Sequence, residues 1–186
     1  GMENQIFESI DEFDDINKLF NPSNYLISPF NSTKKFMEEE YFLTEHQEEI
    51  RTNVMKVVET STTEFMALTG AAGTGKTLLT YDIAKELRNK GKRVLIVHCA
   101  QLNSGQRILQ NNYEWDICMA KTIKDTDLTQ YDIIIVDEAQ RIYQAQFNDI
   151  KVNAEEKKMK CIFSFEEKQY LRNNEKSRNM TEKISE

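Results

Sequence analysis

Eight consecutive residues, Gly70 to Thr77, constrain the fold more than any other stretch of the chain. They spell GAAGTGKT and fit the phosphate-binding loop pattern GxxxxGK(S/T) at every position. Three of the six glycines of the chain fall inside this loop, so a glycine-rich composition does not explain the match. Because such a loop joins a strand to a helix, we expect a strand before it and a helix after it.

The segments on either side of the loop supply that strand and that helix. Residues 64–69 are largely apolar and predict a short buried strand. A helix is predicted after the loop from apolar residues at helical spacing, and it ends at Gly91: Leu78, Leu79, Ile83, Ala84 and Leu87. The alternative is a chance loop between a core strand and a core helix. The complete match and both flanks argue against it.

The loop has a specific chemistry. Its glycines let successive backbone N–H groups turn toward phosphate oxygens, and the helix N-terminus adds partial positive charge. We expect Lys76 to contact the β- and γ-phosphates of ATP and the Thr77 hydroxyl to bind Mg²⁺. The other predicted nucleotide-binding residues of the loop are Gly70, Gly73, Thr74 and Gly75.

A second pattern of strand and carboxylates occupies residues 131–141. Four β-branched residues at 133–136 run directly into Asp137 and Glu138. A buried parallel strand carries its last residues to the carboxyl edge of the sheet, where the phosphates lie. Asp137 is therefore predicted to hold Mg²⁺ through water, and Glu138 to orient and deprotonate the attacking water. The alternative, that Asp137 caps the next helix and Glu138 is a first-turn charge, is disfavoured by the presence of the phosphate loop.

Further strands are predicted at residues 93–98, 114–119 and 160–165, with helical or polar segments between them. This alternation predicts an α/β fold, namely a three-layer P-loop NTPase with a mainly parallel central sheet. His98 closes the strand at 93–98, and we interpret it as a satisfied core or edge residue rather than a catalyst.

The chain divides into three parts. Residues 1–43 contain an amphipathic acidic helix over 3–20 and an aromatic-rich stretch to which the pattern assigns no role. Residues 44–172 form the predicted ATP-binding domain, and residues 173–186 a charged tail or linker.

The ATP-binding domain opens with a helix whose start has a recognisable signature. Thr44 and Gln47 have the spacing of a capping box, in which each side chain bonds the backbone of the other residue. A functional alternative is that Gln47 recognises an adenine edge, and the two roles are compatible.

Composition limits the class of protein. No apolar run approaches the roughly 20 residues that span a membrane, and no signal-peptide pattern is present, so we expect a cytoplasmic protein without membrane contact. The three cysteines are predicted to be buried free thiols: Cys99, Cys118 and Cys161. The net charge of −7 gives no overall attraction to nucleic acid, although a local basic groove is compatible with it.

The phosphate loop, the DEAQR sequence at 137–141 and Gln47 together resemble the first RecA-like domain of superfamily-1 helicases. The resemblance covers residues 40–172 and is strongest to the schlafen-like, domain-of-unknown-function branch of bacterial P-loop proteins. It implies a RecA-like sheet in which the strand at 160–165 lies between the phosphate-loop strand and the strand that ends at Asp137.

The resemblance also implies roles for individual residues. Gln47 is the adenine-recognising glutamine, Gln140 couples the nucleotide site to a neighbouring motif, and Gln169 senses the γ-phosphate as a catalytic residue. Residues 97–103 fall where the family contacts single-stranded nucleic acid. The chain departs from the family at 164–166, where Ser-Phe-Glu replaces the usual Gly-Asp, and this weakens the role implied for Gln169.

These observations favour one function and leave a second open. The first is the Mg-ATP-binding domain of a helicase-like ATPase that acts on single-stranded DNA or RNA. The family uses a second RecA-like domain whose arginine finger is worth about 10³–10⁵-fold in rate, and no stretch after Gln169 matches it. We therefore expect slow hydrolysis until that domain or a partner protein completes the site.

The second function is a nucleotide-dependent switch in which ATP orders a surface for a protein partner. The acidic charge favours the switch, and the ordered motifs favour the ATPase. A small GTPase requires an (Asn/Thr)-Lys-x-Asp motif, and residues 122–125, which read TIKD, do not have that order.

Overall fold

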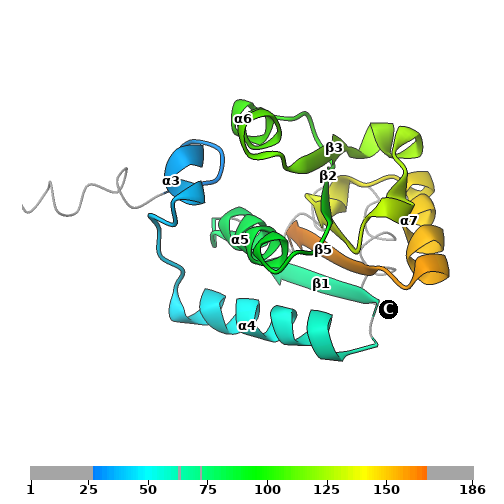
Figure 1. The fold of residues 1–186 in the computed structure, drawn as a ribbon, viewed down its shortest axis with the longest axis horizontal. Coiled ribbons are helices and arrows are strands. Elements are labelled where there is room, and N and C mark those ends of the chain that lie inside the picture. Colours follow the sequence, from blue (N-terminus) through cyan, green and yellow to red (C-terminus); the bar gives the residue numbers. More distant parts are fainter. Residues whose placement is uncertain (1–26, 63, 72, 167–186) are drawn as a thin grey trace, which may run out of the picture.

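The computed structural model describes residues 27–62, 64–71 and 73–166, and its fold is drawn in Figure 1. At its centre is a five-stranded sheet, in which every neighbouring pair of strands is parallel. The strands are β1 (Phe65–Gly70), β2 (Val94–His98), β3 (Asp116–Met119), β4 (Ile133–Asp137) and β5 (Lys160–Glu166). Their order is β1-β5-β4-β2-β3, which confirms the predicted place of β5 between β1 and β4.

Helices cover both faces of the sheet, as the α/β prediction requires. In Figure 1, α5 lies to the left of the sheet with α4 below it and α3 and α6 above, and α7 lies to the right. The helices are α3 (Thr33–Met37), α4 (Glu45–Thr60), α5 (Lys76–Asn89), α6 (Ser104–Tyr113) and α7 (Gln144–Lys157). Three 3₁₀ turns complete the described elements: η1 (Ala120–Asp125), η2 (Leu128–Gln130) and η3 (Ala139–Arg141).

The strands are buried on both faces, because their side chains alternate between two apolar clusters. In β2, Leu95 and Val97 join the cluster under α7, whereas Val94 and Ile96 join the cluster under α5. Burial on both faces explains why these strands have continuous apolar sequences instead of an alternating pattern. A shift of one residue along a strand would exchange the two clusters, so packing fixes the register of the sheet.

Several predicted strand boundaries shift by one or two residues, and the end of one helix is confirmed. The helix after the phosphate loop ends as expected, with Gly91 at a φ of +78° just past its cap. The predicted strand at 114–119 begins two residues later, since Glu114 takes the left-handed cap of α6 with a φ of 55°. The strand predicted at 93–98 begins one residue later, at Val94.

Residues 27–43 pack against α5 and α6, although their sequence gave no indication of a role. The ring of Phe36 is fully buried, stacks on Tyr41 with 5.4 Å between centroids, and meets Trp115 edge-on. The buried Lys85 of α5 donates to the Phe36 carbonyl at 3.2 Å and to the Tyr41 hydroxyl at 2.8 Å. This segment therefore contributes to the core beside α5. The helix expected at 3–20 and the tail at 173–186 lie outside the described residues.

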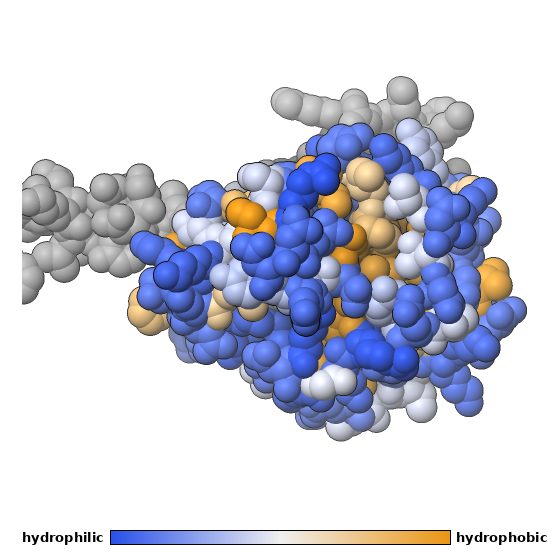
Figure 2. Space-filling view, turned by 45° about the horizontal axis from the view of Figure 1, so that its top comes forward, coloured by the Kyte–Doolittle hydropathy of each residue, from blue (hydrophilic) through white to orange (hydrophobic). Residues whose placement is uncertain are grey.

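The face of the molecule in Figure 2 is mostly hydrophilic, and apolar side chains show mainly along a furrow between hydrophilic ridges. The large apolar side chains that are exposed in the described part of the chain are Phe42, Ile108, Tyr143 and Val152. Within residues 27–62, 64–71 and 73–166, no helix has the length and apolar character to cross a membrane.

The three cysteines are free, as predicted, although only Cys161 is fully buried. Burial raises the pKa of the Cys99 and Cys161 thiols to about 12 and that of Cys118 to about 11. These thiols therefore stay protonated and unreactive at neutral pH.

Phe36 and Phe42 offer a matched test of the packing of residues 27–43. Phe36→Ala is expected to lower the free energy of unfolding by about 3–5 kcal/mol, because it leaves a cavity beneath α5. Phe42→Ala makes the same chemical change at a residue that is 90% exposed and should alter stability by less than about 0.5 kcal/mol. Urea unfolding followed by circular dichroism measures both. Equal effects of the two substitutions would contradict the packing described here.

Candidate functional site

The glycine loop runs from the carboxyl end of β1 to the first turn of α5. Gly73 and Gly75 have φ values of +76° and +75°, a left-handed conformation that glycine adopts without strain. Gly75 is the N-cap of α5, so the unpaired N–H groups of the first helical turn face the loop. The Thr74 hydroxyl donates to the Ala71 carbonyl at 2.8 Å and closes the turn. The loop thus has the backbone geometry of an anion cradle.

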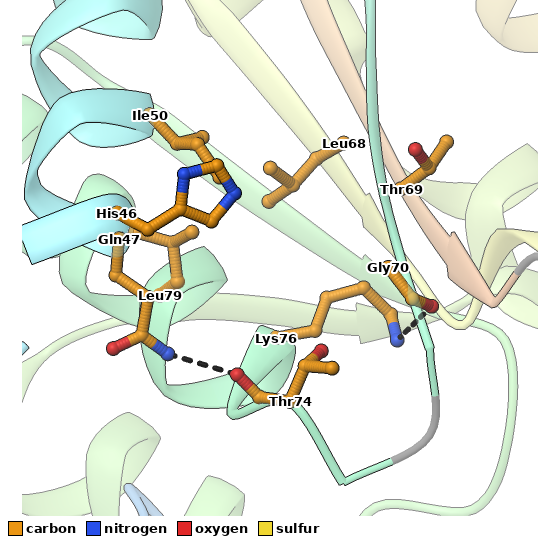
Figure 3. A pocket seen from close by; sticks show the side chains of 9 residues that line it. All are labelled: His46, Gln47, Ile50, Leu68, Thr69, Gly70, Thr74, Lys76 and Leu79. Carbon is orange, nitrogen blue, oxygen red and sulfur yellow. Dashed lines mark hydrogen bonds between the residues drawn. The ribbon is translucent and has the colours of Figure 1, made fainter. Parts of the chain in front are cut away.

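Lys76 is held over this loop by two oxygen atoms from neighbouring strands. Its Nζ donates to the Gly70 carbonyl at 3.4 Å (Figure 3) and lies 3.9 Å from Oε1 of Glu166. Gly70 and Glu166 are register partners at the ends of β1 and β5. The side chains of Lys76 and Glu166 are only 12% and 19% exposed, so water screens their attraction weakly. No local sequence pattern indicates this contact of Glu166.

Gln47 connects α4 to the loop. Its backbone N–H donates to the Thr44 hydroxyl at 3.2 Å, and its Oε1 accepts from the Thr44 N–H at 2.9 Å, which confirms the capping box. Its Nε2 donates to the Thr74 carbonyl at 2.9 Å, the second bond drawn in Figure 3. Recognition of adenine by Gln47 remains a prediction.

A small pocket lies between α4 and the loop, and we call it the α4 pocket. Its lining residues, shown in Figure 3, are His46, Gln47, Ile50, Leu68, Thr69, Gly70, Thr74, Lys76 and Leu79. Its volume of about 130 Å³ is below the roughly 300–1,000 Å³ of pockets that enclose a whole ligand. The pocket therefore suits one part of a ligand, with apolar walls from Ile50, Leu68 and Leu79 and polar groups from Gln47 and Thr74.

The carboxylate of Asp137 lies at the carboxyl end of β4 and is held from two sides. Its Oδ1 accepts from the Glu138 N–H at 3.1 Å, and its Oδ2 lies 3.0 Å from Nδ1 of His98. His98 and Asp137 are register partners at the ends of β2 and β4. His98 is thus a satisfied buried histidine, as predicted, but its partner is the predicted metal ligand, which the sequence did not reveal.

Glu138 follows in a left-handed conformation, with a φ of 58°. Its Oε2 accepts from Nε2 of Gln140 at 2.8 Å and lies 3.6 Å from Nε of Arg141. The next α-helix begins only at Gln144, so Asp137 does not cap it. This geometry removes the structural alternative for Asp137 and places Gln140 in direct contact with the predicted general base.

The predicted metal ligands, Thr77 and Asp137, fit an ion that the protein shares with a nucleotide. In the part of the chain that the structure describes, no group of three or more His, Cys, Asp or Glu residues could hold a metal ion alone. One buried carboxylate and one hydroxyl are the limited donor set that suits Mg²⁺ when phosphates supply further oxygens. Gln169 lies outside the described residues, so its role stays a prediction.

A second depression, of about 240 Å³, adjoins Asp137 at the carboxyl ends of β2 and β3, and we call it the β2–β3 depression. It is lined by His98, Cys99, Ala100, Gln101, Met119, Ala120, Lys121, Arg141, Tyr143 and Gln146. It includes part of the stretch 97–103, for which the family resemblance implies contact with nucleic acid. Two cationic side chains and an exposed tyrosine gather here, in a chain that is acidic overall.

A parallel sheet, a glycine loop at the end of β1 and carboxylates at the end of β4 define an α/β P-loop NTPase fold. The chain belongs to the family of AAA domains, whose pattern matches residues 43–172. No curated protein sequence matches the chain.

Several solved structures resemble this fold at low sequence identity. A replication initiator DnaA bound to AMPPCP and single-stranded DNA has 17% identity and a TM-score of 0.50, covering 79% of this chain and 47% of its own. AMPPCP-bound DnaA from Aquifex aeolicus has 17% identity and a TM-score of 0.49, covering 80% and 48%. The Pif1 helicase from Candida albicans has 17% identity and a TM-score of 0.45, covering 67% and 32%. At this identity the likeness to the first of these structures shows the fold alone, and this chain spans less than half the length of each of the three proteins.

Gly73 and Gly75 offer a matched test of the contact between α4 and the loop. Alanine in a left-handed conformation costs about 1–2 kcal/mol at either position. A Cβ at Gly75 would lie 2.6 Å from Nε2 of Gln47, whereas a Cβ at Gly73 meets nothing within 4 Å. Gly75→Ala should therefore destabilise the protein by about 0.5–1.5 kcal/mol more than Gly73→Ala, because Gln47 loses its hydrogen bond to the Thr74 carbonyl. Urea unfolding measures the difference.

The Gln47→Ala background is the control for this comparison. There the hydrogen bond is already lost, so Gly73→Ala and Gly75→Ala should cost the same. A difference that persists in that background would show that Gln47 is not its cause.

Proposed function

We propose that this chain is the Mg-ATP-binding domain of a helicase-like ATPase that acts on nucleic acid. The observation that carries the proposal is the convergence of Lys76 and Asp137 at one edge of a parallel sheet. A cation beside a glycine loop and a buried carboxylate two strands away are the groups that phosphoryl transfer requires. The narrower likeness to superfamily-1 helicases and to the schlafen-like branch remains part of this proposal.

In this function, Lys76 exchanges its contacts with Gly70 and Glu166 for the β- and γ-phosphates of ATP. The N–H groups of the loop and of the first turn of α5 donate to the remaining phosphate oxygens. Thr77 and Asp137 hold the metal ion, and Mg²⁺ when bound neutralises charge on the phosphates. The residues of the loop thus bind and orient the triphosphate before any bond is broken.

Glu138 is the proposed general base for the attacking water. Its Oε2 accepts from Nε2 of Gln140 and lies 3.6 Å from Nε of Arg141, so two donors hold the carboxylate in place. Catalytic hydrogen bonds commonly align only when substrate is bound, so this orientation is compatible with the role. Hydrolysis is proposed to remain slow until an arginine from a second RecA-like domain or a partner protein reaches the phosphates.

The base of ATP is proposed to enter the α4 pocket. Ile50, Leu68 and Leu79 offer apolar contact to a flat ring, and the amide of Gln47 provides both a donor and an acceptor for adenine. Gln47 also donates to the Thr74 carbonyl, so a base that binds in the pocket and contacts Gln47 would directly affect this hydrogen bond to the loop.

Single-stranded nucleic acid is proposed to bind over the β2–β3 depression. Lys121 and Arg141 can contact phosphates, and the 75%-exposed Tyr143 offers a face on which a base can stack. A solved protein of similar fold, the DnaA described above, is bound to both an ATP analogue and single-stranded DNA. This likeness is compatible with the proposal without identifying the nucleic acid.

A nucleotide-dependent switch that binds a protein partner is the second candidate, and the net charge of −7 favours it. Steady-state Mg-ATP hydrolysis with and without single-stranded DNA or RNA separates the two functions. The helicase-like function predicts stimulation whose midpoint concentration of nucleic acid rises steeply with salt. Lys121→Ala should reduce it without touching Glu138, and Lys151→Ala on α7 is the control of equal charge. Bound ATP without any stimulation would favour the switch.

Glu138→Gln should retain ATP binding while lowering the turnover number by about 10²–10⁴-fold, because the amide cannot accept the proton of water. Lys76→Ala should instead weaken ATP binding by about 100-fold, through the loss of charge-assisted contacts to phosphate. Calorimetric titration with ATP and a phosphate-release assay measure the two quantities. Unchanged turnover in Glu138→Gln would remove Glu138 as the base, and unchanged affinity in Lys76→Ala would remove the phosphate-loop assignment.

A further inference from the structure

Asp137 is buried more deeply than a metal ligand at the surface would be. Its residue is 3% exposed, and its side chain sits at the meeting point of β2 and β4. The oxygen atoms of a buried carboxylate need hydrogen-bond donors to offset their lost hydration. Among the described contacts, one donor serves each oxygen: the Glu138 N–H at Oδ1 and His98 at Oδ2.

The contact with His98 joins Nδ1 of the imidazole to Oδ2 of Asp137 at 3.0 Å. We assign Nδ1 as the donor, since a carboxylate that holds a cation can only accept hydrogen bonds. The side chain of His98 is 9% exposed, which leaves the ring little freedom to turn away. The Cys99 N–H donates to the Asp137 carbonyl at 3.1 Å and fixes the two strand ends against each other.

Two donors on different oxygens set both the position and the plane of the carboxylate. The backbone donor alone would allow the carboxylate of Asp137 to rotate about the Cβ–Cγ bond. The imidazole removes that freedom, so the remaining lone pairs of the carboxylate keep one direction. Hydrogen-bond partners of this kind orient the side chains that hold a metal ion.

We propose that His98 is a positioning residue for Asp137 and that tight binding of a divalent cation with nucleotide depends on the donor at its Nδ1. This inference rests on the proposed function, because it takes Asp137 as the ligand of that cation. It adds a residue at the end of β2 to a site that the sequence motifs place only on the phosphate loop and the end of β4.

The test compares two substitutions of His98, with Mn²⁺ as the probe in the presence of ADP. His98→Asn keeps an N–H donor at the same number of bonds from the backbone as Nδ1, whereas His98→Leu keeps bulk without a donor. Electron paramagnetic resonance measures free Mn²⁺ directly and does not require turnover. His98→Leu should weaken Mn²⁺ binding by about 10–100-fold, and His98→Asn should stay within about threefold of the wild type.

Two controls separate positioning from damage to the fold. ADP affinity in EDTA should be the same in all variants, since the imidazole acts through the metal ligand. Thr33→Val removes a buried hydrogen bond far from the site, from the Thr33 hydroxyl to the Pro29 carbonyl, and should leave Mn²⁺ affinity unchanged. Wild-type affinity in His98→Leu, or equal weakening in His98→Leu and His98→Asn, would overturn the proposal.

Nuclear magnetic resonance of the metal-free protein gives a readout that does not depend on nucleotide. Long-range ¹H–¹⁵N correlation spectra should show His98 with its proton on Nδ1, and Asp137→Asn should alter that signal. A neutral His98 protonated at Nε2 would overturn the inference. Failure of the wild type to bind Mn²⁺ with ADP would overturn the proposed function itself, whereas binding that is insensitive to His98 would overturn this inference alone.

Discussion

The parallel pairing of β1, β5, β4 and β2 is the constraint on which the whole site depends. Strands that share one direction end at the same edge of the sheet, and the register decides which of their last residues are neighbours. Here the register pairs Gly70 with Glu166 and His98 with Asp137. Glu166 and His98, which contact Lys76 and Asp137, therefore come from segments far away in the chain, and the sheet brings them together.

Apolar packing maintains that register. Each central strand places alternate side chains in two different clusters, and a slip of one residue would move every one of them to the wrong side. Burial of a large aliphatic side chain is worth about 1.5–3 kcal/mol, so such a slip would cost far more than any polar contact at the edge could return. The position of the Asp137 carboxylate is thus a consequence of the isoleucines that precede it.

Much of the fold could be predicted because its signals are local. The loop glycines, the buried strands, the capping box of Thr44 and Gln47 and the stop at Gly91 all depend on residues close together in the sequence. The place of β5 between β1 and β4 came from family resemblance. No local pattern could supply it, since parallel neighbours are joined through long crossovers.

The contacts that were missed all join distant segments. Nothing in the aromatic stretch before Thr44 indicates that Phe36 packs beneath α5, because its partners lie about 50 and 80 residues further on. Glu166 was considered only as a departure from a family motif, and its contact with Lys76 depends on strand order. One sequence feature could have indicated the contact of His98. A polar residue at the end of a buried parallel strand lies beside the residue that ends the neighbouring strand.

The ion pair between Lys76 and Glu166 gives the protein its own counter-anion where the phosphates are proposed to bind. A small monovalent anion that enters the loop would take the place of the Glu166 carboxylate beside Lys76 and would bring the same single negative charge. A nucleotide di- or triphosphate brings several charges and many more oxygen atoms, so it gains more than a simple anion when it separates the pair. The nucleotide-free protein is therefore expected to bind simple monovalent anions weakly in the loop and to bind polyphosphate chains more tightly.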